Sequence, residues 1–430
     1  MYLSVTTKFF IAIFFSCCWL IFCIWFSLPW INDLAVYIGD FFAFILIFFM
    51  ALLPGFMNMF LILAYILDKR PKYKPIEDWI NISILVPSFN EEASIKTTID
   101  NILNQDYPGE IEIIAIDNGS TDKTLEILRS YQLKNLVILE ESNKGKSFAL
   151  NLGLKAAKYD YIITLDADTL LWKDAIRHLA TRLLSAPPIT AAVAGSIYVR
   201  NSRETFMTRV QEWDYFNAIA GVKRMQSLFQ ATLVAQGALS LYKKSYIEEV
   251  GGWPHTVGED IVLTWGLLSK GYRIDFAENA IAFTTVPTNY RNFFHQRSRW
   301  SRGMIEAFLA HPEVLTRKRL ITFIVYWNLL FPALDTTFAL VYVPAVIAAF
   351  FGYFLLAGPM TLAVLPLTIL MNLIFFTGQQ RMFAFNKLRV RKNLSGYIYY
   401  ILFYNFLMAP ACIHGYLSEI IVRKKSWGTK

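Results

Sequence analysis

The chain has 430 residues, of which 55% are hydrophobic and only 17% are charged, and its mean hydropathy is +0.39. Soluble globular proteins have about 45–50% apolar and about 25% charged residues, so this composition argues against an ordinary soluble enzyme and indicates a membrane protein. The net charge of +8 does not indicate nucleic-acid binding, because the basic residues lie beside apolar segments, where anionic lipid and membrane orientation explain them.

Two apolar runs open the chain. Residues 9–28 carry no charge, and residues 41–67 are equally apolar, with Pro54, Gly55 and Asn58 inside them. A helix needs about 20 apolar residues to cross a bilayer, so we predict two transmembrane helices within residues 1–67, joined by a short loop at 29–40. The first run is too long for a cleaved signal peptide, whose apolar core has about 7–15 residues.

Basic residues set the expected orientation. The loop at 29–40 contains no Lys or Arg, whereas Lys69, Arg70, Lys72 and Lys74 follow the second run. The positive-inside rule places these residues in the cytoplasm. We therefore predict a multi-pass protein of the cell (inner) membrane, with a cytoplasmic domain over residues 68–300.

The central domain alternates between two kinds of pattern. Short apolar runs predict buried strands at residues 82–87, 111–116, 136–139 and 161–165. Helical patterns fall between them at residues 93–103, 123–131 and 146–158. This order predicts an α/β fold, a Rossmann-like parallel sheet inserted between transmembrane helices. In such sheets the ligand lies beyond the carboxyl ends of the strands.

Polar residues follow three of these strands. The segments are Pro87-Ser88-Phe89-Asn90-Glu91, Asp117-Asn118-Gly119-Ser120-Thr121-Asp122 and Asp166-Ala167-Asp168. Carboxylates two residues apart at a strand end can point the same way. The repulsion between Asp166 and Asp168 is tolerable if Mg²⁺ or Mn²⁺ bridges them to a diphosphate; an acidic turn is the alternative.

Three later motifs could complete a sugar-transfer site. Asn143-Lys144-Gly145-Lys146 precedes a helix and suits the phosphate or base of a nucleotide, although it could be an exposed loop. The other two are Gly258-Glu259-Asp260 and Gln296-Arg297-Ser298-Arg299-Trp300. Asp260 could deprotonate a hydroxyl, Arg299 could neutralise a departing diphosphate and Trp300 could stack on a sugar. Taken one at a time, Asp260 could instead be a helix cap, Arg299 a lipid-facing residue and Trp300 a core residue.

The C-terminal part contains three more apolar runs, at residues 320–356, 360–377 and 398–416. We expect an amphipathic interfacial segment at 301–319, transmembrane helices within 320–418 and a basic tail at 419–430. Three crossings would place this tail outside, whereas its charge favours the inside. Two arrangements would resolve this conflict. Either the run at 320–356 is broken near Pro332 and Asp335 into an interfacial piece and a span, or the last segment does not cross the membrane fully.

In this order, the motifs resemble the processive synthases of glycosyltransferase family 2, which make cellulose, chitin, hyaluronan or poly-N-acetylglucosamine. The resemblance covers residues 80–305 and implies a GT-A-like domain that uses a UDP-sugar, Mg²⁺ or Mn²⁺, and a growing polysaccharide beside the bilayer. A small membrane partner subunit is a further expectation, and nucleic acid is not a partner.

The resemblance also implies a role for each matching residue. A nucleotide-sugar site would include Pro87, Asn90, Glu91, Asp117, Lys146 and Asp166, with Asp117 and Lys146 touching the uridine. Asp166 and Asp168 would hold the metal, Asp168 being the direct ligand. Asp260 would be the general base, supported by Glu259, and the diphosphate and acceptor end would contact Gln296, Arg299 and Trp300.

Two positions depart from the family pattern. Asn118 replaces the second Asp of the usual D-D-G-S run, so we assign it no role. Gly258 replaces the usual Thr of T-E-D, which puts in doubt any contact from that side chain but leaves Glu259 and Asp260 in place.

The branch of the family that the sequence resembles most makes poly-β-1,6-N-acetylglucosamine. The segments that carry this resemblance are Val210-Gln211-Glu212, Lys223-Arg224-Met225-Gln226 and Gly251-Gly252-Trp253. It implies polymerisation of N-acetylglucosamine from UDP-GlcNAc and extrusion of the product. Hyaluronan, chitin-oligosaccharide and glucan synthases remain alternatives. A non-processive lipid glycosyltransferase and a transporter are further alternatives, and for a transporter only Asp335 is a clear charged candidate within a span.

Overall fold

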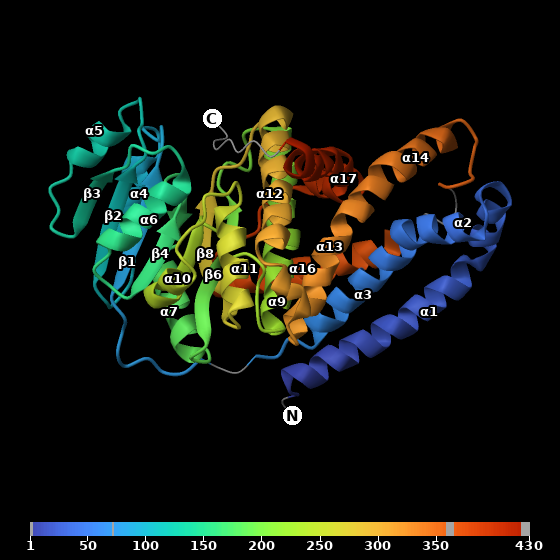
Figure 1. The fold of residues 1–430 in the computed structure, drawn as a ribbon, viewed down its shortest axis with the longest axis horizontal. Coiled ribbons are helices and arrows are strands. Elements are labelled where there is room, and N and C mark those ends of the chain that lie inside the picture. The colour runs from blue at the N-terminus through green and yellow to red at the C-terminus, as the bar shows by residue number, and fades with distance from the viewer. Residues whose placement is uncertain (1–2, 71–72, 358–364, 423–430) are drawn as a thin grey trace.

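The computed structural model describes residues 3–70, 73–357 and 365–422. Figure 1 shows a sheet domain on the left and a group of long helices on the right, with helix α12 (Tyr290–Ala310) between them. The sequence is therefore divided as expected, since the sheet domain lies between N-terminal and C-terminal apolar helices.

All four predicted strands are present, as β1 (Ile82–Ser88), β2 (Ile111–Asp117), β3 (Leu136–Glu140) and β4 (Tyr161–Leu165). Four more strands complete the sheet: β5 (Leu170–Leu171), β6 (Thr190–Val199), β7 (Leu239–Lys243) and β8 (Arg273–Thr284). Their order is β3-β2-β1-β4-β7-β6-β8-β5.

The sheet is mixed, and its first four strands pair in parallel as expected. Strands β1 to β4 pair in parallel, but β7 runs antiparallel to both β4 and β6, and β5 runs antiparallel to β8. Leu239 at the start of β7 pairs with Leu165 at the end of β4. The segment that enters β7 therefore lies at the same edge of the sheet as Asp166.

Helices cover both faces of the sheet. The predicted helices appear as α4 (Ile95–Leu103), α5 (Thr124–Arg129) and α6 (Lys146–Ala156), followed by α7 (Ala175–Ser185), α10 (Lys244–Glu249) and α11 (Glu259–Ser269). Alternate residues of β1 enter different cores, because strand side chains alternate between faces. Ile84 packs with residues of α4 and α7, whereas Leu85 packs with residues of α6.

Long apolar helices flank this domain. The N-terminal ones are α1 (Val5–Ile38) and a continuous stretch made of α2 (Asp40–Ile47), the π-helical turn η1 (Phe48–Leu52) and α3 (Leu53–Ile66). The C-terminal ones are α13 (Leu320–Thr337), η4 (Phe338–Tyr342), α14 (Val343–Phe350), α16 (Leu365–Phe385), α17 (Leu394–Leu417) and η5 (Ser418–Val422).

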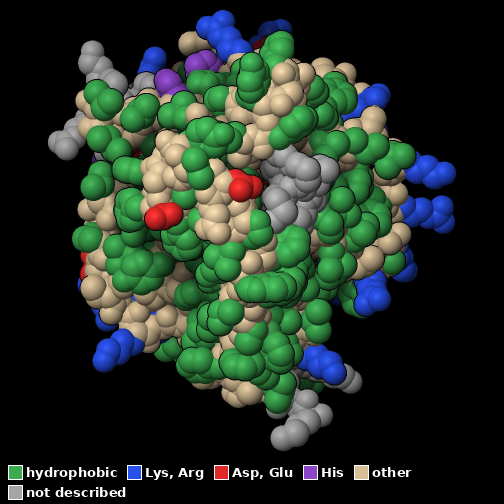
Figure 2. All heavy atoms as spheres, turned by 90° about the vertical axis from the view of Figure 1, so that its right-hand side faces the viewer, with side chains coloured by type: hydrophobic (Ala, Val, Ile, Leu, Met, Phe, Trp, Pro, Cys, Tyr) green, Lys and Arg blue, Asp and Glu red, His purple; other side chains and the backbone are tan. Residues whose placement is uncertain are grey.

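Among the described residues, four of these stretches are long and apolar enough to cross a membrane: Val5–Ile38, Asp40–Ile66, Leu320–Phe350 and Leu394–Ile421. Figure 2 shows hydrophobic side chains covering most of the face that this end of the molecule presents, with Lys and Arg mainly at its margin. The structure thus agrees with a membrane protein.

Two expected interruptions of the apolar helices are absent. Instead of a loop at 29–40, α1 continues through Pro29 to Ile38, and only Gly39, with φ 79°, separates it from α2. Trp30 and Leu34 pack in one core with Ala43 on the next helix. This burial outweighs the backbone hydrogen bond lost at Pro29. The break expected near Pro332 is also missing, because α13 remains helical from Leu320 to Thr337.

The expected boundary between residues 300 and 301 falls inside a helix. Helix α12 runs without interruption from Tyr290 to Ala310, and a short 3₁₀ turn, η3 (Pro312–Thr316), connects it to α13. The segment predicted as interfacial therefore begins as the second half of α12.

Helix α17 lies across the direction of the other apolar helices. Figure 1 shows it end-on, while α1, α3 and α13 extend along the picture. It packs against α12 and α8 (Phe206–Trp213), which belong to the sheet domain. The direction of this last apolar segment therefore differs from that of α1, α3 and α13. The basic residues that follow, 423–430, lie outside the described residues, as does the start of the run predicted at 360–377.

The sheet domain and the apolar helices share one hydrophobic core. Phe229 follows α9 (Ala220–Leu228) and packs against Phe9 of α1 and Phe60 of α3, with ring centroids 5.3 and 5.4 Å away. Phe60 in turn meets Trp327 of α13 at 5.2 Å. Since aromatic pairs at these distances contribute beyond simple burial, the two parts are firmly joined.

Candidate active site

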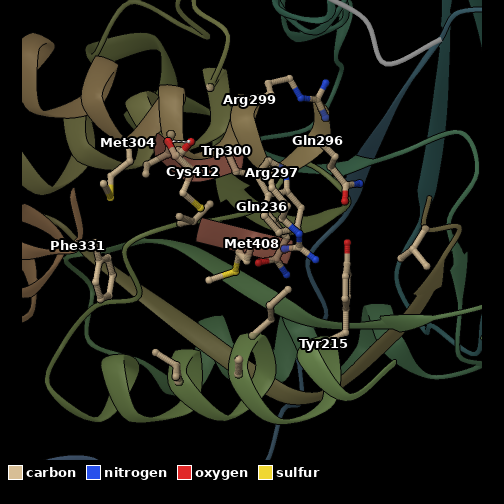
Figure 3. A pocket seen from close by; sticks show the side chains of 18 of the residues that line it. Tyr215, Gln236, Gln296, Arg297, Arg299, Trp300, Met304, Phe331, Met408 and Cys412 are labelled. Atoms are coloured by element: carbon tan, nitrogen blue, oxygen red, sulfur yellow. Dashed lines mark hydrogen bonds between the residues drawn. The ribbon is translucent and has the colours of Figure 1, made fainter. Parts of the chain in front are cut away.

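A large cavity lies where the sheet domain meets the apolar helices. Its volume is about 1340 Å³, and its lining extends from Asp166 and Asp260 at the sheet to Trp30 and Asp335 on the apolar helices. Figure 3 shows the middle of this cavity, where Gln296, Arg297 and Tyr215 lie toward one side and Met304, Cys412 and Phe331 toward the other. Residues far apart in the sequence therefore line one cavity.

Two carboxylates enter the cavity directly after β4. Asp166 Oδ1 accepts a hydrogen bond from Lys146 Nζ at 2.5 Å, and Asp168 Oδ1 accepts one from Thr284 Oγ1 at 3.3 Å. No cluster of three or more His, Cys, Asp or Glu side chains suited to a metal occurs in the described part of the chain. A cation here would therefore use two carboxylates and complete its shell with phosphate oxygens and water, as Mg²⁺ commonly does. The residues fit Mg²⁺ or Mn²⁺ bound together with a diphosphate.

Lys146 begins α6 and lies among carboxylates. Its Nζ is 2.5 Å from Asp166 Oδ1 and 3.7 Å from Glu259 Oε1. Burial opposes the charged form, but these carboxylates outweigh it and raise the pKa of Lys146 above its usual value. The protonated amine offsets part of the negative charge that gathers at this end of the cavity.

Glu259 and Asp260 open helix α11 in different environments. Glu259 is only 7% exposed, and burial raises its pKa to about 7 although Lys146 opposes the rise. Asp260 is half-buried, and its oxygens accept hydrogen bonds from the backbone amides of Ile261 at 2.8 Å and Gly237 at 3.2 Å. These amides fix the Asp260 carboxylate, which lines the cavity beside Glu259.

Asp117 lies at the end of β2, and only one of its two carboxylate oxygens accepts hydrogen bonds from the described chain. Oδ2 accepts hydrogen bonds from the amides of Gly119 at 3.2 Å and Ser120 at 3.1 Å. Oδ1 is buried and has no hydrogen-bond partner in the described chain. A buried acceptor left without a donor costs about 1–3 kcal/mol, so an N–H or hydroxyl group of a ligand would stabilise this position.

Asn118 has a structural role that the sequence did not reveal. Its amide nitrogen donates to the carbonyl groups of Glu141 and Asn143 at 3.1 and 2.7 Å, and its oxygen accepts from the Gly145 amide at 2.8 Å. These bonds fasten the loop that precedes Lys146. Asp at this position could not donate the two hydrogen bonds, which accounts for one departure from the family pattern.

The segment after β1 contributes to the cavity unevenly. Pro87 and Glu91 line the cavity. Asn90 is not among the described residues that line it. Asn90 has a φ of 55°, and its Oδ1 accepts a hydrogen bond from the Thr121 amide at 2.8 Å. The Asn90 side chain thus ties the loops after β1 and β2 together, and its contact with the nucleotide-sugar stays a prediction.

Helix α12 brings Gln296, Arg299 and Trp300 to the cavity, as expected from their shared motif. Gln296 Oε1 is buried without a hydrogen-bond partner among the described residues, and Trp300 is 39% exposed. In Figure 3, Arg299 lies on α12 near Gln296 and Trp300. The helix therefore offers a cation, an amide and an aromatic ring together.

Gly258 departs from the family pattern for a steric reason. A Cβ atom at Gly258 would lie 2.6 Å from the Cα of Gly303 on α12, and one at Gly303 would lie 2.8 Å from the Cα of Gly258. Glu306 Oε2 also accepts a hydrogen bond from the Gly258 amide at 2.9 Å. Thr would not fit at position 258 unless α11 and α12 moved apart.

Comparison with known proteins agrees with this geometry. Residues 83–251 match the model of Glycosyl transferase family 2. The poly-beta-1,6-N-acetyl-D-glucosamine synthase of Staphylococcus aureus (strain COL) is 33% identical over 276 residues, covering 61% of this chain and 66% of the relative. That of Staphylococcus epidermidis is 32% identical over 285 residues, covering 63% of this chain and 68% of the relative. The chain belongs to glycosyl transferase family 2.

This family 2 glycosyltransferase also shares its fold with a solved structure. The mannosyltransferase PcManGT from Pyrobaculum calidifontis, in complex with GDP-Man and Mn²⁺, superimposes with a TM-score of 0.59 at 21% identity, covering 87% of this chain and 99% of that one. The match with the Staphylococcus aureus synthase spans just under two thirds of that relative's length. The family and its GT-A-like fold are thus established for this glycosyltransferase.

Proposed function

We propose that this chain is a processive, inverting glycosyltransferase that polymerises N-acetylglucosamine from UDP-GlcNAc into a β-linked polysaccharide and extrudes it across the membrane. The observation that carries this proposal is the continuous cavity. Asp166, Asp168 and Asp260 line the same space as Asn328 and Asp335 of the apolar helix α13. A site that only glycosylated a soluble acceptor would gain nothing from such a connection.

The donor would bind along the carboxyl ends of β1, β2 and β4. Asp117 Oδ1, buried and unpaired in the described chain, suits a hydrogen-bond donor of the uridine. Asp166 and Asp168 would hold Mg²⁺ or Mn²⁺ against the diphosphate, and this cation would offset the charge that develops on the leaving group. Arg299 and Gln296 would bind the diphosphate from α12, adding fixed positive charge and an amide.

Transfer would proceed by attack of an acceptor hydroxyl on the sugar carbon from the face opposite UDP. Asp260 would accept the hydroxyl proton, since its carboxylate is held by two backbone amides and is more accessible than that of Glu259. Glu259, buried beside Lys146, would shape the charge around Asp260. Trp300 would stack on the acceptor sugar and keep its hydroxyl near Asp260.

The product would leave through the part of the cavity that the apolar helices line. Polar groups from several helices line it, namely Asn328, Asp335, Thr368, Asn405 and Tyr416. Asp335 Oδ2 accepts a hydrogen bond from Tyr416 Oη at 2.8 Å. Polar side chains within apolar helices are costly unless they serve a polar ligand, and a sugar chain supplies hydroxyl groups along its whole length. Basic residues after α3 would keep the catalytic domain in the cytoplasm, where UDP-sugars are made.

The donor can be tested directly. We expect purified protein with Mg²⁺ or Mn²⁺ to release UDP from UDP-GlcNAc and to form a polymer, which linkage analysis then identifies. The same assay with UDP-glucose and with paired UDP-GlcNAc and UDP-glucuronate provides the comparison. Turnover with UDP-glucose alone, or a product that requires glucuronate, would assign a glucan or hyaluronan synthase instead.

The role of Trp300 leads to a second prediction. Trp300→Ala should reduce polymer yield at least about tenfold and leave UDP affinity nearly unchanged, because we expect the sugar to gain from the ring about as much as a stacked nucleic-acid base does, about 1–3 kcal/mol. Polymer yield and UDP titration on the same sample measure the two effects. Trp265→Phe, which alters a fully buried Trp elsewhere in the fold, is the control for general destabilisation. Equal losses of polymer and UDP binding would show that Trp300 only supports the fold.

A further inference from the structure

A cation is buried within the motif that carries Trp300. Arg297 is only 4% exposed, and its Nη2 donates a hydrogen bond to Asp214 Oδ2 at 2.7 Å. The same Asp214 oxygen accepts a hydrogen bond from Tyr404 Oη at 2.7 Å. Asp214 belongs to the π-helical turn η2 (Asp214–Ile219) and Tyr404 to α17. Arg297 of α12 is therefore bonded to η2 directly, and α17 is bonded to the same carboxylate.

The Arg297 guanidinium also lies against the aromatic ring that faces the cavity. Its Cζ is 4.1 Å from the centroid of the Trp300 ring, closer than to Phe293 at 5.1 Å or Tyr215 at 5.8 Å. Residues three apart on a helix share a face, and arginine stacks on Trp better than other cations do. Figure 3 shows Arg297 and Trp300 together at the cavity, with Tyr215 close by.

One nitrogen of the Arg297 side chain makes no hydrogen bond in the described chain, so the ion pair with Asp214 does not satisfy all its donors. Its Nε is buried and has no hydrogen-bond partner among the described residues, although the side chain lines the cavity. An isolated pair would be more stable with all donors satisfied. The Arg297 Cζ atom instead lies 4.1 Å from the centroid of the Trp300 ring, while Nε makes no hydrogen bond in the described chain.

We infer that Arg297 is a positioning residue that fixes the orientation of the Trp300 indole, and that Asp214 and Tyr404 hold Arg297 in place. The inference rests on the proposed function, in which Trp300 stacks on the acceptor sugar. Trp300 is 39% exposed, so its own surroundings leave one side of the ring open. A cation clamped on the ring removes rotational freedom and keeps the open side available to a sugar. Through Tyr404, helix α17 is linked to the acceptor end of the site.

A double-mutant cycle separates this role from simple support of the fold. Asp214→Asn keeps the shape of the side chain but removes the charge that holds Arg297. We expect it to slow polymer synthesis at least about fivefold, the range of a lost cation–π contact, with UDP affinity unchanged. In the Trp300→Ala background, Asp214→Asn should cause no more than a twofold further loss, because the ring on which Arg297 acts is gone.

The chain offers a matched control and a milder variant. Arg182 and Asp275 form another ion pair with a buried carboxylate, with two contacts of 2.8 Å, outside the cavity lining. Asp275→Asn should change the rate of polymer synthesis by the same factor in the wild-type and Trp300→Ala backgrounds. Tyr404→Phe removes one hydrogen bond to Asp214 and leaves the ion pair, so it should act in the same direction as Asp214→Asn but less strongly. If Asp214→Asn does not fold, Tyr404→Phe provides the cycle.

A second measurement reports the ring directly and does not depend on catalysis. In protein labelled with 5-fluorotryptophan, the Trp300 resonance, assigned by its loss in Trp300→Phe, should shift or broaden in Asp214→Asn and stay unchanged in Asp275→Asn. The inference would be overturned if the rate losses of Asp214→Asn and Trp300→Ala multiplied in the double variant and the Trp300 resonance stayed unchanged in Asp214→Asn. A wild-type protein that makes no polymer from any UDP-sugar would overturn the proposed function instead, while the resonance would still decide whether Arg297 orients Trp300.

Discussion

Asp260→Asn is expected to lower the rate of polymer synthesis by roughly 10² or more, while UDP affinity and metal dependence stay near those of the wild type. A sugar hydroxyl is a poor nucleophile near neutral pH, and a positioned carboxylate typically accelerates its attack about 10²–10⁴-fold. Asn keeps the shape of Asp260 and can accept one of its two hydrogen bonds, from the amide of Gly237 or of Ile261, but it cannot take up the proton. Initial rates of UDP release and a UDP titration measure both quantities.

Glu259→Gln is the control for this substitution, because Glu259 is the adjacent carboxylate and lines the same cavity. We expect it to slow the reaction less than Asp260→Asn does. Near-normal turnover in Asp260→Asn would contradict the role of base. So would a loss of rate matched by an equal loss of UDP binding, since Asp260 would then be a donor-site residue.

The second large effect concerns the metal. Excess chelator should abolish synthesis, and added Mn²⁺ or Mg²⁺ should restore it, because Asp166 and Asp168 provide two carboxylates and the diphosphate needs a cation to offset its charge. Dialysed protein assayed over a range of metal concentrations tests this expectation. Asp168→Asn should raise the concentration needed for half-maximal activity.

Glu140→Gln is the matched control, because Glu140 is an exposed carboxylate that pairs with Arg129 on the surface. It should leave the metal requirement unchanged. Full activity in excess chelator would show that Lys146, which already contacts Asp166, serves in place of a metal.

The fold of the first half of the sheet could be predicted because its signals are local. Each strand from β1 to β4 is a short apolar run, and the helix that follows begins near a polar turn. The later strands were not predicted. The orientation of β7, for example, depends on its pairing with Leu165 and with Ala194 of β6, contacts between segments far apart in the chain. Pairing of that kind leaves no periodic pattern in a single sequence.

The candidate site shows the same division. Asp166, Asp260 and Trp300 could be placed together because they belong to motifs in a familiar order, and all three line the cavity. The partners of Asn90 and Asn118 could not be predicted, since their hydrogen bonds join separate loops. Proline likewise misled the helix boundaries, because the helices continue through both Pro29 and Pro332 despite the local preference of the ring.

The contact between Gly258 and Gly303 limits how far α11 and α12 can move relative to each other. The two glycines meet backbone to backbone, one residue before Glu259 and three residues after Trp300. No side chain of the described residues lies between the two Cα atoms, so the separation of α11, which carries Asp260, from α12, which carries Trp300, depends at this point on main-chain contact. A bulkier residue at either position must therefore shift an entire helix. In related sequences, we expect these two positions to change together, and a library that varies only one of them should yield mostly inactive proteins.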